Sequence, residues 1–336
     1  MNGLTLARDY YSAYGSSVLD AAESICPGLS GRLSIGLAGE GSQCFGYDDE
    51  ISQDHDFAPG FCVWMSDDDY AAYGPALQRV YGSLPPEFHG FTQQNLIAED
   101  RLGVMSVSVF FGSLTGIPET DQNWLFLSES ALASAVNGEI WLHGCQEFEA
   151  VRRRLQDFYP YDILRKKIAA RAAVMSQAGQ YNLLRMLQRG DLVAAQLAAA
   201  RFTEATISMI HLLNRRYTPF YKWAYRSLTE LAAESPLAEL TARKLAELPG
   251  VCILPVRENV QESVRESVRE SVHVEDGTEA AYEITETICE AVAKELGMQE
   301  FSKSRSRFLQ DHLEDIMSGI KNSQIRAMHP MADPAF

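Results

Sequence analysis

Residues 39–56 read GEGSQCFGYDDEISQDHD, and they follow a short apolar segment, residues 32–38 (RLSIGLA). Such a segment is typical of a buried strand, which here would run into a turn. Glycine lets the backbone approach a ligand closely, and exposed backbone N–H groups beside a hydroxyl can hold a triphosphate. The sequence therefore predicts that Gly41 and Ser42 form a phosphate-binding bend at the end of this strand.

Asp54 and Asp56 flank His55 at the end of the same stretch. We expect a second strand over residues 54–65, on which both carboxylates would share one face while His55 lies on the other. Two such carboxylates suit Mg²⁺ or Mn²⁺, which take oxygen ligands and substrate phosphates. We therefore predict that Asp54 and Asp56 are catalytic metal ligands; the alternative is a solvated turn, in which aspartate is common.

Two more residues of the stretch, Asp48 and Ser52, either contact nucleotide phosphates or brace the loop. Phosphoryl transfer requires that developing charge be neutralised and that the attacking and leaving oxygens be held in line. Paired aspartates would position the metal and the Gly-Ser turn would position the phosphates. The sequence contains no GxxxxGK[ST], GxGxxG or GxSxG motif, so the P-loop, Rossmann and hydrolase classes lose support.

A Gly-Ser turn followed by Asp-x-Asp resembles the DNA polymerase beta-type (minimal) nucleotidyltransferase superfamily. The chain is more closely similar to a bacterial family known as domain of unknown function 4037, over roughly residues 30–230. The residues that carry this likeness are Gly41-Ser42, Gly46-x-Asp48, Ser52-x-Asp54-His55-Asp56, Pro59, Trp124-Leu125, Tyr159-Pro160-x-Asp162 and Arg215-Arg216-Tyr217-x-Pro219-Phe220-x-Lys222-Trp223.

The resemblance implies a small mixed sheet that bears the site, with helices that close over it. It also implies a nucleoside triphosphate and Mg²⁺ as ligands, and it leaves the acceptor open. The superfamily usually places a third carboxylate on a later strand, but the expected strand over residues 103–111 contains no acid. Either another acid replaces it, or the second metal is weakly held, or the domain binds nucleotide without turnover; Asp162 is our candidate for a substitute catalytic acid.

The best cluster of basic residues within this resemblance contains Arg215, Arg216 and Lys222. Arg216 or Lys222 would reach the triphosphate or the acceptor, unless the cluster is simply a solvated helix end. Two other basic runs, residues 152–154 and 165–167, are expected to be exposed helix faces. We therefore list Arg216 and Lys222 with Gly41, Ser42, Asp48 and Ser52 as predicted nucleotide-binding residues.

The pattern of apolar residues predicts mixed strands and helices over residues 1–147 and a helical bundle over residues 148–330. Together with the resemblance, this implies an α+β fold in which a small mixed β-sheet nucleotidyltransferase domain precedes an all-α helical bundle domain. In the first domain we expect helices over 4–24, 67–82 and 128–137, and a last strand at 139–142. In the second we expect about four helices between 148 and 248, then helices over 279–297 and 301–326. Residues 255–278 contain a tandem ESVR repeat, interpreted as a charged linker or surface helix rather than a partner-binding motif.

The net charge of −16 disfavours binding to extended nucleic acid, although a local basic pocket for a nucleotide is compatible with it. The sequence shows no export signal and no apolar span long enough for a membrane, and its six cysteines form no C-x-x-C pair. A cytoplasmic location with free thiols is the expectation. The predicted function is transfer of a nucleoside monophosphate from a triphosphate to a small molecule, an RNA end or a protein; the alternative is an inactive nucleotide-binding sensor that meets a protein partner.

Overall fold

The computed structural model describes residues 1–53, 57–93, 101–116, 124–252 and 274–336. These residues divide into two compact units, 1–159 and 160–336. The first is mixed α and β and the second is helical, which confirms the expected combination of a small mixed sheet and many helices. The helix α7, which the sequence assigned to the helical half, belongs to the first unit.

The first unit is built on a four-stranded mixed sheet in the order β5-β2-β1-β6. Strand β1 pairs antiparallel with both β2 and β6, and β2 pairs parallel with β5. The elements of this unit, in chain order, are α1 (Gly3–Ile25), β1 (Ser34–Leu37), α2 (Ser42–Phe45), β2 (Cys62–Met65), α3 (Asp67–Tyr81), β3 (Glu87–Phe88), β4 (Phe91–Thr92), β5 (Gly103–Ser106), α4 (Val107–Leu114), α6 (Glu129–Val136), β6 (Glu139–Leu142) and α7 (Gln146–Gln156).

Both faces of the sheet are covered, so β1, β2 and β5 are buried along their whole length. Val63 and Met65 belong to a buried cluster with residues of α1 and α3. Trp64, which alternates with them along β2, stacks on Phe148 of α7 with ring centroids 4.3 Å apart. The sheet therefore lies between two helical layers, and its buried strands read as continuous apolar runs rather than alternating ones.

The helices with clear caps form where the sequence places them. Ser66 accepts a hydrogen bond from the N–H of Asp69 at the start of α3, and Ser128 caps α6 in the same way through Ala131. The strand expected over 103–111 is wrong beyond Ser106, because the Ser106 hydroxyl accepts a hydrogen bond from the N–H of Val109 and begins α4. The strand expected over 54–65 is described only from residue 57, and β2 begins at Cys62.

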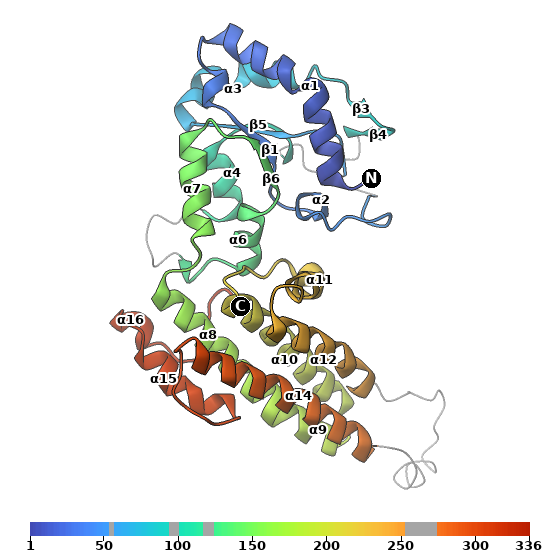
Figure 1. Ribbon diagram of the computed structural model, residues 1–336, viewed down its shortest axis with the longest axis vertical. Coiled ribbons are helices and arrows are strands. Elements are labelled where there is room, and N and C mark those ends of the chain that lie inside the picture. Colours follow the sequence, from blue (N-terminus) through green and yellow to red (C-terminus); the bar gives the residue numbers. More distant parts are fainter. Residues whose placement is uncertain (54–56, 94–100, 117–123, 253–273) are drawn as a thin grey trace. The chain divides into compact units, whose positions relative to one another are not determined.

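The second unit is a helical bundle in which α8 packs along α10 (Figure 1). Its elements are α8 (Tyr161–Met175), a π-helical segment (Ser176–Leu183), α9 (Leu184–Gln188), α10 (Leu192–Leu213), α11 (Tyr221–Leu231), α12 (Pro236–Cys252), α14 (Val274–Met298), a 3₁₀ turn (Leu309–His312), α15 (Leu313–Ser318) and α16 (Ser323–Arg326). Residues 253–273, which hold most of the ESVR segment predicted as a linker, lie outside the described residues.

The single helix expected over 301–326 is wrong, since this stretch contains only short helical pieces. The serines before them explain the interruption. The Ser302 hydroxyl accepts a hydrogen bond from the N–H of Ser304, and Ser304 and Ser306 do the same for Ser306 and Phe308. Serine side chains that bond to nearby backbone compete with the helical pattern. Within the described residues, no helix is both long and apolar enough to cross a bilayer.

The basic runs expected to be exposed are partly buried, which corrects that expectation. Arg152 donates to the carbonyls of the three residues at the end of α6, and burial lowers its pKa to about 10. In the second unit Arg165, Lys166 and Lys167 on α8 are buried as well. Arg152 and Arg165 donate to backbone carbonyls of other elements, Lys166 donates to carbonyls of residues 330 and 332, and Lys167 contacts the carboxylate of Asp333. These partners lie outside the helix that carries each side chain, so the sequence of that helix does not reveal them.

Candidate functional site

The bend predicted at Gly41 lies directly after β1. Gly39 and Gly41 have φ of 125° and 99°, which glycine adopts readily and other residues do not. The side chain of Asn137 fixes the bend, because it accepts a hydrogen bond from the N–H of Gly39 at 2.9 Å and donates one to its carbonyl at 2.7 Å. The short helix α2 then begins at Ser42, which is half-buried.

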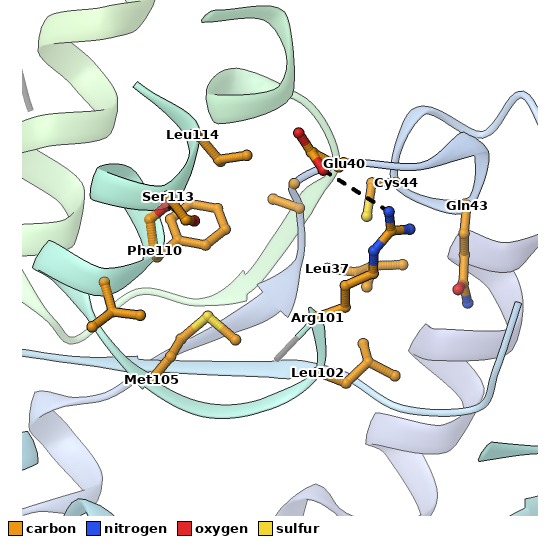
Figure 2. Close-up of a pocket in the computed structure, with 13 residues that line it drawn as sticks. Leu37, Glu40, Gln43, Cys44, Arg101, Leu102, Met105, Phe110, Ser113 and Leu114 are labelled. Atoms are coloured by element: carbon orange, nitrogen blue, oxygen red, sulfur yellow. Dashed lines mark hydrogen bonds and ion pairs between the residues drawn. The ribbon is translucent and has the colours of Figure 1, made fainter. Parts of the chain in front are cut away.

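A hollow of about 230 Å³ lies beside this bend (Figure 2). Its apolar surface includes Leu37 of β1, Met105 of β5 and Phe110 of α4, and its charged groups are Glu40 and Arg101. In Figure 2 the Arg101 side chain extends toward Glu40 and Cys44, opposite the side chains of α4. The hollow thus combines an apolar surface with a charged edge, as pockets for small molecules commonly do.

Arg101 is the cationic group of this hollow. Its Nη2 lies 3.9 Å from Oε2 of Glu40, and its side chain is 28% exposed while that of Glu40 is 66% exposed. A Cβ placed on Gly41 would lie 2.7 Å from Nη1 of Arg101, so the guanidinium lies against the backbone of the bend. A planar guanidinium with several N–H donors is well suited to a phosphate or carboxylate group.

Cys44 lines the same hollow, but its thiol is not a nucleophile at neutral pH. Burial raises its pKa to about 12, with Glu40 acting in the same direction and Arg101 against it. The thiol of Cys62 behind it is also buried and its pKa is raised. Because the thiolate is the reactive form, covalent catalysis by either cysteine is disfavoured.

A hydrogen-bonded network connects α2 to the chain that follows the acidic pair. Gln43 is buried, and its Nε2 donates to the carbonyls of Ala58 at 3.0 Å and Gly3 at 3.4 Å. The N–H of Gly3 donates in turn to Oδ2 of Asp48 at 3.0 Å. Residues 57–63 are buried throughout. The bend, the start of α1 and the segment that begins at residue 57 are thereby held together.

Asp48 and Ser52 both brace this part of the chain. Asp48 holds the start of α1 through Oδ2, while its Oδ1 is buried and has no hydrogen-bond partner among the described residues. Ser52 forms a compact turn with Asp49, in which each accepts a hydrogen bond from the backbone N–H of the other. Both residues thus make contacts that brace the chain, and their contact with nucleotide phosphates stays a prediction.

The predicted metal ligands Asp54 and Asp56 lie outside the described residues. Across the residues that the structure describes, no group of three or more His, Cys, Asp or Glu side chains could hold a metal ion. The observation that bears on a cation is the buried, unpartnered Oδ1 of Asp48, since a carboxylate oxygen is a ligand that Mg²⁺ accepts. The binding of a metal ion and the ligand role of the acidic pair stay predictions.

The other predicted site residues belong to the second unit. Asp162 lies in the first turn of α8, and its two oxygens accept hydrogen bonds from the N–H groups of Lys321 at 3.0 Å and Asn322 at 2.8 Å. These bonds give Asp162 a structural role. Arg216 forms an exposed ion pair in which its Nη2 lies 3.5 Å from Oε2 of Glu234. Nζ of Lys222 lies 5.2 Å from the ring centre of Trp223. Their predicted roles in nucleotide binding and catalysis stay predictions.

Sequence reasoning missed Arg101, Asn137 and Gln43, which complete the surroundings of the bend. Arg101 and Asn137 are distant from residues 39–56 along the chain, and no local pattern marks them. Gln43 stands inside the quoted stretch, two residues after Gly41. The glutamine between Ser42 and Cys44 is the only local hint, and its burial and its bond to Ala58, which make it the anchor of α2, become visible in the structure.

Residues 124–224 match the model of a family described as a domain of unknown function, DUF4037. The match confirms the predicted likeness for this region, which runs from Trp124 in the first unit to Ala224 in α11. No curated protein and no solved structure matches the chain.

Proposed function

We propose that the chain is a magnesium-dependent nucleotidyltransferase, which transfers a nucleoside monophosphate from a triphosphate to an acceptor and releases diphosphate. The observation that carries the proposal is the Gly41–Ser42 bend, which ends a buried strand beside a hollow and has the Arg101 guanidinium against its backbone. Phosphate groups fit such a place because the backbone approaches closely there and the Arg101 guanidinium lies against it, while the neighbouring carboxylate of Glu40 is 66% exposed and can turn toward solvent.

The reaction requires that an acceptor oxygen bond to the α-phosphorus as the bond to the diphosphate oxygen breaks. The acceptor proton is lost to a carboxylate or to solvent, and diphosphate leaves. Arg101 would bind the departing phosphates and stabilise their charge. Gly41 and Ser42 would orient them through N–H and hydroxyl groups. Cys44 stays protonated and takes no part in bond formation.

Asp54 and Asp56, with the unpartnered oxygen of Asp48, are the residues that would hold Mg²⁺ or Mn²⁺. The ion supplies charge neutralisation at the phosphates and alignment of the attacking and leaving oxygens. The buried network of Gln43 and Ala58 supports this assignment, because it anchors the chain next to the acidic pair to the helix that follows the bend.

Release of diphosphate from each of the four nucleoside triphosphates, with Mg²⁺ or Mn²⁺ and a cell extract as the source of acceptor, tests the proposal. We expect Asp54→Asn to lower turnover by at least about 100-fold, the scale seen when a group that stabilises transition-state charge is removed. Glu50→Gln removes one carboxylate from the same loop at an exposed position and is the matched control. Equal turnover in the two variants would contradict the proposal.

Arg101 provides a second and independent test. We expect Arg101→Met to weaken triphosphate affinity by about tenfold or more, because a charged hydrogen bond to phosphate is lost. The control is Arg79→Met, which removes the same charge from the exposed face of α3. Affinity that changes equally in both variants would show that only net charge matters and would remove Arg101 from the site.

The alternative function is a sensor that binds a nucleotide without turnover, with the helical half meeting a protein partner. One observation favours it. Strand β5 reads Gly-Val-Met-Ser and passes directly into α4, so it carries no third carboxylate. Tight binding of one triphosphate, with no release of diphosphate for any of the four bases, would select the sensor.

A further inference from the structure

Three basic side chains on α8 are buried together in the second unit. Lys166, Lys167 and Arg171 each have a residue exposure of 0%. Buried cations are costly unless anions or well-placed acceptors surround them. We call these three side chains the α8 basic cluster. The groups that contact them explain why their burial is tolerated.

Among the described residues, contacts to all three side chains come from residues 329–336, here called the strap, which lies alongside α8 (Figure 1). The carboxylate of Asp333 accepts a hydrogen bond from Nη1 of Arg171 at 2.6 Å. Both of its oxygens also accept from Nζ of Lys167, each at 3.3 Å. Lys166 donates to the carbonyls of Pro330 at 2.9 Å and of Ala332. Burial acts to raise the pKa of Asp333, but Arg171 and Lys167 outweigh it, so the pKa is lowered and the carboxylate is ionised at neutral pH.

An aromatic ring accompanies the carboxylate. The Phe336 ring centre lies 3.7 Å from Cζ of Arg171, a cation–π distance. Arg171 thus donates to an anion through one nitrogen while its planar face lies against a ring. Its Nε also donates to Ser208 of α10 at 2.6 Å, which fixes the orientation of the guanidinium.

Charged contacts and apolar burial both hold the strap in place. Residues 330–333 and 335 are of intermediate exposure, and Phe336 is 38% exposed. The side chain of Asp333 is the most buried part, at 1%. Apolar burial therefore contributes to the attachment, and the ion pairs of Asp333 and the hydrogen bonds of Lys166 to two carbonyls add to it.

The cluster and the strap also differ in their relation to the matched family. The DUF4037 match, residues 124–224, includes α8 and Ser208, whereas the strap lies outside it. The cationic side of this contact is therefore part of the matched region, and the anion that fills it comes from elsewhere in the chain.

We propose that the α8 basic cluster is a binding site for a phosphate group, and that the strap occupies this site as an internal ligand. Asp333 takes the place of the phosphate and Phe336 that of a neighbouring planar group. A phosphate carries more charge and more acceptor oxygens than a carboxylate, so it can satisfy Lys166, Lys167 and Arg171 together. The site belongs to the second unit and does not depend on the nucleotidyltransferase function proposed for the first.

Calorimetric titration of the full chain with inorganic phosphate, diphosphate and a nucleoside monophosphate, in chelator without metal, tests the site. We expect Asp333→Asn to bind at least one of these probes about tenfold more tightly than the unaltered chain, because the internal competitor is lost. Glu314→Gln removes one exposed carboxylate from α15 and is the matched control. The probe that gains most distinguishes free phosphate from a phosphate ester.

The double variant Asp333→Asn/Asp54→Asn distinguishes this site from the one proposed in the first unit. It must bind the probe as tightly as Asp333→Asn alone. Absence of any gain over Glu314→Gln, with circular dichroism showing a folded chain, overturns the proposal. If Asp333→Asn does not fold, hydrogen exchange of residues 329–336 in the unaltered chain tests the proposal instead. Faster exchange in phosphate than in chloride at matched ionic strength supports the site, and equal exchange overturns it.

Discussion

The backbone of Gly41 and the guanidinium of Arg101 lie so close together that a side chain at position 41 would displace the guanidinium. Gly41 has φ of 99°, and a Cβ at this position would meet Nη1 of Arg101 at 2.7 Å. The nearest atom belongs to the end of a flexible side chain, so Arg101 rather than the backbone would move. A substitution at Gly41 therefore acts on the charge of the hollow as well as on the conformation of the bend.

Gly41→Ala tests this relation. We expect a loss of about 1–3 kcal/mol in the free energy of unfolding, measured by urea titration, because φ of 99° with ψ of 154° lies in a region that is essentially restricted to glycine. We also expect weaker triphosphate binding, because Arg101 is displaced. Gly90→Ala is the control, since Gly90 has φ of 82° and open space around its Cβ position. Triphosphate affinity equal to that of Gly90→Ala would show that Arg101 is not displaced.

The buried amine of Lys166 leads to a prediction about how the free energy of unfolding depends on pH. Burial lowers its pKa to about 8, and Arg171 and Lys167 act in the same direction while Asp333 opposes them. Between about 8 and the ordinary value of 10.5 the unfolded chain binds more protons than the folded one, so this group makes stability rise with pH in that window. Cys44 and Cys62, whose pKa values are raised, act in the opposite direction in any variant. We therefore expect the free energy of unfolding of the unaltered chain to rise relative to that of Lys166→Met across these pH values in urea titrations. A constant difference between the two proteins would contradict the assignment to Lys166.

At the scale of elements, caps and periodicity were enough where the controlling contacts are local. Ser66 and Ser128 begin α3 and α6 as the sequence indicated. The strand predicted over 103–111 was wrong beyond Ser106, because Val-Ser-Val-Phe-Phe suits either a buried strand or a buried helix and the cap at Ser106 decides between them. The apolar pattern alone therefore could not distinguish the two, and the local hydrogen bond from Val109 to Ser106 did.

The candidate site follows the same division. The bend at Gly41 and Ser42 could be placed from the sequence, because a short apolar strand and a glycine turn are local features. Arg101 and Asn137 could not be placed, since β5 and β6 bring them to the bend only when the sheet forms. The basic residues of α8 were misread as exposed because their partners, such as the carbonyls near Ile316, lie far along the chain.

Arg165 shows how strongly such partners hold an element. Its Nε donates to Ile316 and its Nη2 to Phe301 and Asp315, all at 2.9 Å to carbonyl oxygens. Lysine lacks the planar fork that reaches these carbonyls together. We expect Arg165→Lys to lower the free energy of unfolding by about 2–3 kcal/mol, because buried carbonyls lose their donors. Arg153→Lys, on the exposed face of α7, should change it by less than about 0.5 kcal/mol. Similar losses in both variants would contradict the buried role of Arg165.

At the scale of the whole molecule, the net charge restricts which class of acceptor the proposed reaction can use. The chain carries a net charge of −16, with 29 Lys and Arg against 45 Asp and Glu. Five of the basic side chains are buried and bonded internally, namely Arg152, Arg165, Lys166, Lys167 and Arg171. They contribute little to the field outside the protein, so a phosphate backbone meets a surface richer in carboxylates than the composition suggests.

We therefore expect the full chain to bind a long single-stranded RNA weakly at physiological salt, while it still binds a nucleoside triphosphate with Mg²⁺. Fluorescence polarisation with a labelled RNA measures this, and the same RNA with a basic peptide serves as the positive control. A protein that neutralises several phosphates loses affinity steeply as salt rises, because bound counterions are released. Tight binding with such a steep dependence would reveal a basic surface and favour an RNA end as the acceptor. Weak binding at every salt concentration leaves a small molecule or a protein side chain, because these acceptors carry few phosphates into the acidic field.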